Sequence, residues 1–438
     1  MKERIKSALL LLLVLCSLFL TQQLWFGRRP AEMTVENGYE PVYFEEPRPL
    51  SQMIVPEAIT LYSRGQCHRL RPGETDFNLF WEKSSTMLQE LAEPGYYYYA
   101  EPPPPEAERC FSLQFEPSLP LGPESIWLKG RSSGALAELE IRRLEDRCWA
   151  ILKESAGDAS LLLLPPGWST ELAALYDRFA PAPEQLCEEL PEGELSLSRG
   201  LAVNLDAPLL VPVGVSSLKR FSLKPERLDR ELLLKTFFIN RNLVREIEEK
   251  DGGFIYTDGE QGLRLGRGLD YSHPRLEKTA GLDYTAALLT AGKLISYHGG
   301  WVKNLRLQML AGGDEEKEGS GRACRAQWRS LLDGYPLLGD SGVLIYYHHG
   351  GLLSYRRNLY EPLEQPGDGV AVAEFRKVLE KAVTLLEEEG AAGPLLERME
   401  LAYYLEGEEA VPVWQIHLNG RELLLKTDEL VPPEGWEP

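Results

Sequence analysis

The stretch Met399–Lys426 reads MELAYYLEGEEAVPVWQIHLNGRELLLK, and it decides which class of fold this chain is expected to have. Apolar residues are dense in Met399–Leu405 and Val413–Leu418, which predicts two strands. Asn419-Gly420 is a two-residue turn typical of hairpins, and it leads into a third strand at Leu423–Leu425. The stretch therefore predicts an antiparallel sheet in the last part of the chain.

The segments before this sheet predict helices packed with hairpins. Tyr284–Tyr297 is expected to be a helix that ends at Gly299-Gly300, because glycine favours the left-handed conformation of a helix C-cap. Val343–Tyr347 and Leu352–Arg356 are expected to pair as strands. A helical stripe of apolar residues then ends at Gly390; it consists of Val372, Phe375, Leu379, Ala382 and Leu386. This order of helix, hairpin, helix and hairpin predicts an α+β fold with antiparallel sheets and packed helices.

The middle of the chain predicts two helices followed by a hairpin. Pro225 stands where the first residue of a helix is favoured, so Glu226–Phe237 is expected to be helical. Asn240 is a suitable N-cap for a second helix over Arg241–Lys250. Beyond it, Phe254–Tyr256 and Gly262–Leu265 flank a turn at Asp258-Gly259, which predicts a hairpin.

A region in which strands and helices alternate is expected before these segments. Strands are expected at Ala58–Tyr62, Cys110–Phe115 and Leu136–Arg142, and helices at Asp76–Ala92 and Ser169–Phe179. The full division predicted for the chain is a tail at 1–6, a transmembrane helix at 7–27, a proline-rich stalk at 28–53, a first α+β domain at 54–180, a middle domain at 181–274, a C-terminal domain at 275–430 and a tail at 431–438.

The N-terminal segment Ser7–Phe26 reads SALLLLLVLCSLFLTQQLWF and is long and apolar enough to cross a bilayer. A retained anchor is favoured over a cleaved signal peptide, because no small-residue cleavage site follows the apolar run. Basic residues before the span favour a cytoplasmic N-terminus and an extracytoplasmic bulk. One helical face carries two hydroxyl groups that could bind a neighbouring helix or their own backbone; this face consists of Leu10, Val14, Ser17, Thr21 and Leu24.

Composition narrows the class of partner. The net charge of −20 makes binding to nucleic acid improbable, and the membrane contact is therefore expected to come from the apolar span. Five cysteines follow the span without close spacing, which predicts buried thiols with at most one incidental bridge rather than a disulfide framework. No sequence motif for a metal or a cofactor is present.

Several segments, taken in order, resemble the YycH family of membrane-anchored extracytoplasmic regulators. They are the basic hexamer and leucine-rich span, Leu243–Gly252 with the hairpin after it, His298–Trp301, Asp333–Leu337, and Tyr403–Trp414. The matching positions are Tyr256, Thr257, Asp258, Gly259, Gly262, Leu263, Arg264, Tyr271, Pro274, Gly299, Gly300, Trp301, Gly334, Tyr335, Pro336, Arg356, Pro412 and Trp414.

The resemblance implies a binding role in the regulation of a two-component system (YycFG, also called WalKR). It implies a C-terminal domain similar to the sister regulator YycI and to PepSY modules. The implied partners are a YycI-like protein, the transmembrane helices of a YycG/WalK-type sensor histidine kinase, and the membrane. No cofactor and no catalytic residue are implied, so the chain is expected not to be an enzyme.

Two alternatives stay open from the sequence. Gly339-Asp340-Ser341-Gly342 matches the nucleophile motif of one protease class, which would suit a membrane-tethered cell-wall hydrolase, although a turn entering a strand also explains it. A ligand-binding ectodomain is the second alternative. His348 and His349 are adjacent on an expected strand and would point to opposite faces, so they do not predict a metal site. Trp414 is expected to be a core residue of the last hairpin or a contact with the sister protein.

Overall fold

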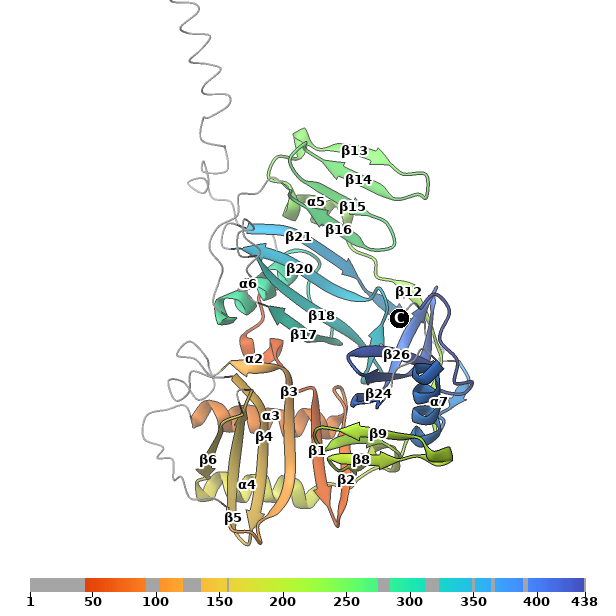
Figure 1. The fold of residues 1–438 in the computed structure, drawn as a ribbon. Helices are drawn as coiled ribbons and strands as arrows, with labels where there is room; N and C mark the ends of the chain where they lie inside the picture. Colours follow the sequence, from red (N-terminus) through yellow and green to blue (C-terminus); the bar gives the residue numbers. More distant parts are fainter. Residues whose placement is uncertain are drawn as a thin grey trace, which may run out of the picture. The chain divides into compact units, whose positions relative to one another are not determined.

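Two large antiparallel sheets dominate the computed structural model of the chain (Figure 1). The structure describes residues 44–91, 103–120, 135–155, 157–274, 284–311, 323–348, 351–363, 367–388 and 393–436. The expected transmembrane helix and its face, Leu10, Val14, Ser17, Thr21 and Leu24, lie outside these ranges. None of the helices within the described ranges combines the length and the apolar character needed to cross a bilayer.

The first sheet has eight strands in the order β10-β7-β2-β1-β3-β4-β5-β6. Its strands are β1 (Ala58–Ser63), β2 (Gln66–Leu70), β3 (Glu108–Pro120), β4 (Ala135–Leu144), β5 (Arg147–Glu154), β6 (Ala159–Leu163), β7 (Leu186–Leu190) and β10 (Leu209–Pro212). The strands predicted at Ala58–Tyr62, Cys110–Phe115 and Leu136–Arg142 are therefore confirmed, because each lies within an observed strand.

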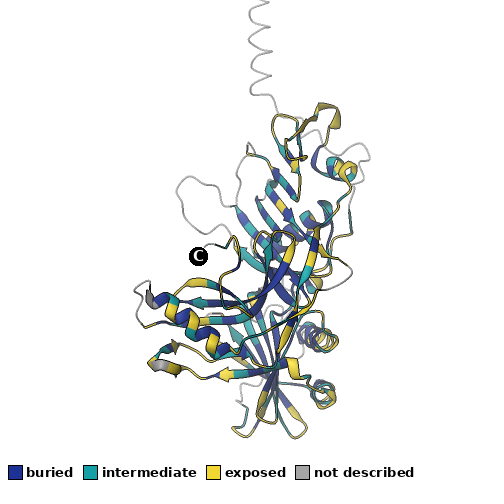
Figure 2. Ribbon diagram, turned by 90° about the vertical axis from the view of Figure 1, so that its right-hand side faces the viewer, coloured by how far each residue is buried: buried dark blue, intermediate teal, exposed yellow. Residues whose placement is uncertain are grey.

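Two helices cover one face of this sheet, as both views show (Figures 1 and 2). They are α3 (Thr75–Glu90) and α4 (Pro166–Arg178), and a short α2 (Leu50–Met53) precedes β1. On α3, Phe80 packs edge-on against Phe111 of β3 with ring centroids 5.0 Å apart. Along β4, Leu139 and Ile141 belong to the core, so the alternation of a strand turns Glu138, Glu140 and Arg142 to the opposite face.

The second sheet has fourteen strands. Its main path runs β13-β14-β15-β16-β21-β20-β18-β19-β24-β25-β12-β22, while β17 pairs with β18 and β26 with β25. The strands are β12 (Phe221–Pro225), β13 (Arg245–Glu248), β14 (Phe254–Thr257), β15 (Gly262–Leu265), β16 (Leu269–Ser272), β17 (Leu305–Ala311), β18 (Cys324–Leu332), β19 (Tyr335–Leu338), β20 (Gly342–His348), β21 (Gly351–Asn358), β22 (Tyr360–Pro362), β24 (Leu396–Glu406), β25 (Glu409–Leu418) and β26 (Arg421–Lys426). Its pairs are antiparallel except β19–β24, which is parallel. The α+β class with antiparallel sheets is confirmed.

The remaining elements are three helices and two small ribbons. The helices are α5 (Arg230–Phe237), α6 (Tyr284–Tyr297) and α7 (Phe375–Glu388), and short 3-10 turns occur at η2 (Pro183–Gln185), η3 (Ser198–Gly200) and η4 (Arg241–Leu243). The ribbons pair β8 (Gly193–Ser196) with β9 (Ala202–Leu205) and β11 (Ser217–Lys219) with β23 (Gly369–Ala371). Figure 2 shows the buried positions concentrated along the strands of the sheets.

Two local predictions are wrong. Pro225 ends a strand rather than starting a helix, because the backbone N–H of Glu226 donates to Leu359 at 2.8 Å and keeps the chain extended. The helix begins instead at Arg230, where the Asp229 carboxylate accepts from the N–H of Leu232 at 3.0 Å. Val372 lies before α7, and its N–H donates to Ser216.

The helix predicted over Arg241–Lys250 is also wrong. Asn240 does cap the first turn, accepting from the N–H of Asn242 at 3.2 Å, but only η4 follows. Residues Arg245–Glu248 then form β13, since they pair in full register with β14. The gain from strand pairing thus outweighs the helix propensity of a glutamate-rich segment.

The sheets run across the domain boundaries predicted from the sequence. β7 and β10 belong to the predicted middle domain, yet they extend the first sheet. β12 comes from the same segment and pairs with β25 of the C-terminal part. The described residues belong to one compact unit, and the boundaries at 180 and 274 stay a prediction.

Candidate functional site

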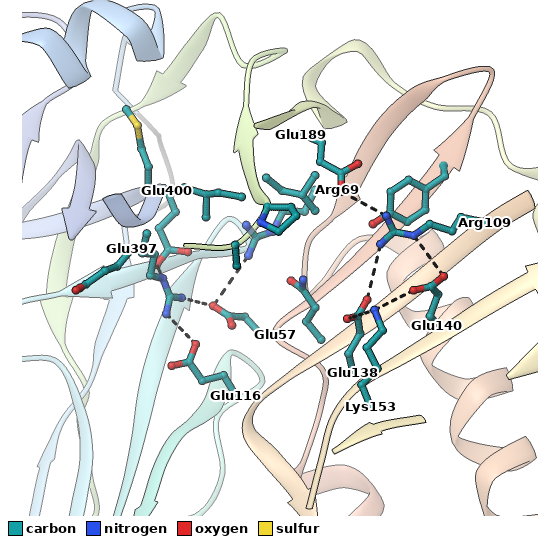
Figure 3. A pocket seen from close by; sticks show the side chains of 18 of the residues that line it. Glu57, Arg69, Arg109, Glu116, Glu138, Glu140, Lys153, Glu189, Glu397 and Glu400 are labelled. Carbon is teal, nitrogen blue, oxygen red and sulfur yellow. Dashed lines mark hydrogen bonds and ion pairs between the residues drawn. The ribbon is translucent and has the colours of Figure 1, made fainter. Parts of the chain in front are cut away.

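A cavity of about 760 Å³ lies between the first sheet and the strands β24 and β25 (Figure 3). Charged side chains line most of it, namely seven glutamates and five arginines and lysines, and one histidine lies among them. These residues are Glu57, Arg69, Arg109, Glu116, Glu138, Glu140, Arg142, Lys153, Glu189, Glu397, Arg398, Glu400 and His417. We call this region the ion-paired seam, because it joins the two sheets.

One half of the seam is centred on Glu140 of β4, whose side chain is only 2% exposed. Its carboxylate is 2.6 Å from Arg142 Nε, 3.0 Å from Lys153 Nζ and 3.5 Å from Arg109 Nε. Burial raises the pKa of this carboxyl, but the hydrogen bonds from Lys153 and Arg142 and the charge of Arg109 outweigh burial and lower its pKa overall. Glu140 is therefore ionised at neutral pH.

Arg109 connects this half of the seam to strand β7. Its guanidinium lies 3.3 Å from Glu189 and stacks over the Tyr62 ring at 3.9 Å from the ring centroid. Burial raises the pKa of Tyr62 to about 12, so its phenol stays neutral. β1, β3, β4 and β7 are thus held on one charged surface.

The other half of the seam is centred on Arg398 of β24. Its guanidinium forms ion pairs with Glu57, with Glu116 at 2.8 Å and with Glu400 at 2.9 Å. Burial lowers the pKa of Arg398, but the three carboxylates outweigh it and raise the pKa well above its usual range. Since Glu57 and Glu116 come from the first sheet's side and Arg398 from the second sheet, this cluster is an electrostatic link between the sheets.

A second buried charge lies away from the seam, at Arg357 of β21. Its side chain is 0% exposed and makes two 2.8 Å hydrogen bonds to the Glu226 carboxylate. It also donates to the carbonyls of Gly300 at 2.7 Å and Gly299 at 3.2 Å. Gly299 has φ of +121°, and a Cβ there would lie 2.9 Å from the Arg357 guanidinium carbon. The absence of a side chain at Gly299 therefore leaves room for this arginine, and Gly300 contributes its carbonyl oxygen.

The end of α6 packs against the same region. His298 is buried and stacks on Phe237 with ring centroids 3.9 Å apart. Burial lowers the pKa of His298 to about 3, so the ring is neutral at physiological pH. Trp301 donates from its indole N–H to Ser296 at 3.0 Å and packs edge-on against Trp328. His298 and Trp301 are therefore packing residues at a helix end.

The predicted hairpin positions are brought together in β14–β16. Asp258 accepts hydrogen bonds from the N–H groups of Glu260 and Gln261 at 3.0 and 3.1 Å, which is the chemistry of a turn. Thr257 donates to the Gln261 carbonyl, and Tyr271 donates to the Gln261 side chain. Arg264 forms ion pairs with Glu249 and Asp251. Tyr256 and Leu263 are buried, and the other motif positions in or beside these strands are Gly259, Gly262 and Pro274.

Gly334 lies elsewhere, in the turn between β18 and β19, and Tyr335 and Pro336 are the first residues of β19. The Arg71 guanidinium stacks over the Tyr335 ring at 4.5 Å. Gly334 has φ of +81°, and a Cβ there would lie 2.9 Å from the Arg71 Cβ. This motif therefore positions the contact between the sheets beside the seam, where a smaller cavity is lined by Arg69, Arg71 and Cys187.

Of the last motif positions, Pro412 and Trp414 are in the core and Arg356 is on the surface. Trp414 is 1% exposed and Pro412 is buried, so Trp414 is a core residue of β25. Arg356 points to the surface, where it pairs with Asp270 at 2.8 Å, while its neighbour Arg357 is the buried one. Ser341 lies on the turn that enters β20, and its hydroxyl has no hydrogen-bond partner among the described residues. His348 is buried, and His349 lies outside the described residues.

Sequence reasoning missed the residues that carry the buried charges: Glu140, Arg398, Arg357 and Glu226. One signal was present, since Glu138, Glu140 and Arg142 alternate with apolar residues in the predicted strand Leu136–Arg142. That alternation indicates a charged face, but it does not say what the face contacts.

These features define a class: an α+β protein with two extended antiparallel sheets that are joined by buried ion pairs. Within that class, the fold is that of YycH. The chain is similar to the crystal structure of YycH from Bacillus subtilis, with a TM-score of 0.55 and 14% sequence identity, over 88% of this chain and 99% of that chain.

The resemblance to YycH is therefore confirmed in the fold. A second solved structure, an uncharacterized protein from Eubacterium rectale, is 11% identical over 53% of this chain and 90% of that chain with a TM-score of 0.36, a similarity too low to support an argument. No protein-family model and no curated protein matches the chain.

Proposed function

We propose that this chain is a membrane-anchored extracytoplasmic regulator that modulates a sensor histidine kinase of the YycG/WalK type. The observation that carries the proposal is the YycH-like fold, which spans 88% of this chain and 99% of YycH. The apolar segment Ser7–Phe26 supports an anchor at the membrane, with the N-terminus in the cytoplasm and the folded part outside.

The partners of this regulator are a YycI-like sister protein and the transmembrane helices of the kinase. A regulator of this kind acts by binding one state of its partner more tightly than another, and the usual coupling is about 1–3 kcal/mol. The span contributes the face Leu10, Val14, Ser17, Thr21 and Leu24, whose hydroxyls are available to neighbouring helices. The C-terminal part, with the hairpin β24–β25, is the YycI-like and PepSY-like domain.

The alternative of a cell-wall hydrolase has less support. Nucleophilic catalysis by serine needs a base within hydrogen-bond reach of the hydroxyl. The Ser341 hydroxyl has no such partner among the described residues. A ligand-binding role has one favourable observation, the charged cavity of about 760 Å³, and it is compatible with regulation.

The test of the proposal is cross-linking in cells. Single cysteines replace Leu10, Val14, Ser17, Thr21 or Leu24 in a chain whose Cys16 is changed to Ser, and captured proteins are identified by mass spectrometry. We expect adducts with the kinase or with a YycI-like protein from this face. Cysteines at Leu12, Leu15 and Phe19, which a helical period places on the opposite side, are the matched controls and are expected to give few adducts.

A second measurement reads function directly. Replacement of Ser7–Phe26 by an unrelated transmembrane helix is expected to change the output of a kinase-dependent reporter while the chain keeps its normal abundance. Equal adducts from both faces, together with an unchanged reporter, would show that the mechanism through the span is wrong. Hydrolysis of wall fragments by the full chain that is lost in Ser341→Ala would favour the hydrolase instead.

A further inference from the structure

Two cysteines that are far apart in the sequence lie directly opposite each other in the first sheet. Cys67 of β2 and Cys187 of β7 are register partners on antiparallel strands. Opposite residues of such a pair point to the same face, with Cα atoms about 4.5–5.5 Å apart. Disulfides form when this separation is about 4.4–6.8 Å, so the spacing of paired strands is compatible with a bridge between the two cysteines.

Both thiols are on the face of the sheet that carries the seam. Cys67 is also the register partner of Tyr62, which lines the charged cavity, and its sulfur lies 4.0 Å from the Glu189 carboxylate. Cys187 lines the smaller cavity beside the seam. Cys67 is 9% exposed and Cys187 is 6% exposed, so both thiols have limited access to a small reagent.

The other described cysteines are not placed in this way. Cys110 is on β3 and Cys148 on β5, and the whole of β4 runs between those two strands. Cys324 is on β18 of the second sheet. All five are present as free thiols. The pair on β2 and β7 is therefore the one with the geometry of a cross-strand bridge.

We propose that Cys67 and Cys187 form a reversible disulfide that fastens β7 to β2 at the edge of the seam. With oxidised glutathione as the oxidant, the Cys67 thiolate attacks one glutathione sulfur, the glutathione S–S bond breaks, and the first glutathione leaves. The Cys187 thiolate then attacks the Cys67 sulfur, and the second glutathione leaves. Overall, one small disulfide is reduced to two thiols while the two protein thiols lose two hydrogens.

The environment of the thiols sets the rate of this exchange. Burial raises the pKa of Cys67 to about 11 and also raises the pKa of Cys187. Since the thiolate is the attacking species, the exchange is slow at neutral pH and faster in mildly alkaline solution. The bridge closes a long loop, from residue 67 to residue 187, so the oxidised protein is expected to unfold at a higher temperature.

The bridge also acts on the seam itself. β7 supplies Glu189 to Arg109, and β10, which pairs only with β7 in the first sheet, supplies Leu209 and Leu210 to the cavity wall. Oxidation therefore adds a covalent constraint to the strands that close one side of the cavity, and reduction removes that constraint.

The test uses the full chain in detergent, incubated with oxidised glutathione at mildly alkaline pH. Free thiols are then blocked with N-ethylmaleimide, and the protein is digested without reduction and analysed by mass spectrometry. We expect a peptide pair that joins Cys67 to Cys187, its disappearance after dithiothreitol, and a higher melting midpoint of the oxidised form. Cys67→Ser and Cys187→Ser should each lose both the linked peptide and the rise in midpoint.

Cys110→Ser and Cys324→Ser are the matched controls and should keep the linked peptide. Recovery of Cys67 and Cys187 as free thiols or as separate glutathione adducts, from protein that melts cooperatively, would overturn the proposal. A predominant link through Cys110, Cys148 or Cys324 would overturn it as well. If the serine variants fail to fold, the wild-type peptide map by itself decides between these outcomes.

Discussion

Replacing Arg357 by methionine tests whether a buried ion pair holds the junction of β21, β12 and α6. Arg357 makes two 2.8 Å hydrogen bonds to Glu226 and donates to the carbonyls of Gly299 and Gly300. Methionine has a similar length but no donor. The variant therefore leaves a carboxylate that is 13% exposed without its cation, and two carbonyls without their donor.

The expected loss follows from this geometry. Removing one member of a buried pair costs about 3–5 kcal/mol, because the remaining charge stays desolvated. The neighbouring residue provides a matched control. Arg356 is 55% exposed and pairs with Asp270 at 2.8 Å, so Arg356→Met should cost only about 0–1 kcal/mol. A double change, Arg357→Met with Glu226→Gln, should cost less than the sum of the two single changes.

The assay is equilibrium unfolding in urea, followed by tryptophan fluorescence, with all variants at one pH and salt concentration. Trp301 and Trp328 lie close to the site and report on its loss of structure. If Arg357→Met and Arg356→Met lower the free energy of unfolding by the same amount, the buried pair is not the stabilising contact inferred here. Strict additivity of the double change would contradict the coupling between Arg357 and Glu226.

Three further predictions follow from the same contacts. The pKa of Glu140 is lowered in the fold, so its contribution to stability is present above the unfolded pKa of 4.5 and is lost as the pH falls through the folded pKa. Glu140→Gln should therefore make the free energy of unfolding fall less steeply at acid pH, and an unchanged slope would contradict this. Burial lowers the pKa of His298 from 6.5 in the unfolded chain to about 3 in the fold, so its contribution to stability is full above pH 6.5 and falls as the pH drops toward 3. NMR should find the His298 ring neutral at pH 5, and a protonated ring at that pH would refute the burial argument. Gly299→Ala should destabilise by more than about 1 kcal/mol, and by more than Gly259→Ala, which has a positive φ but open space around it; equal melting midpoints would show that the close approach to Arg357 is tolerated.

The predictability of each element depended on how local its cause is. Tyr284–Tyr297 was predicted with the observed bounds, because its apolar period and its terminal glycines act within one helix. The hairpin around Asp258 was equally local, since the carboxylate accepts from the N–H groups of Glu260 and Gln261 in the same turn. The segment Arg241–Lys250 misled the prediction, because its fate depends on pairing with β14.

The site was predicted in part for the same reason. The sequence indicates Gly299, Gly300 and Gly334 as motif positions. In the structure, Gly299 packs against Arg357 and Gly334 packs against Arg71, while the Gly300 carbonyl accepts a hydrogen bond from Arg357. The sequence does not predict which arginine is buried beside the glycines, because Arg356 and Arg357 are neighbours of the same chemical type. Only the pleat of β21, which sends one to solvent and the other to Glu226, distinguishes them.

By itself, the sequence determined the apolar span, the α+β class and the antiparallel hairpins, since these depend on residue type, period and turn chemistry over a few positions. Tertiary structure alone decided that β7 and β10 extend the first sheet, that Arg398 of β24 meets Glu57, and that Cys67 faces Cys187. The pairing of β7 with β2, the contact of Arg398 with Glu57 and the pairing of the two cysteines each join residues more than a hundred positions apart in the chain. Their physical cause is the pairing of strands and the satisfaction of buried charges, which no local pattern of residues encodes.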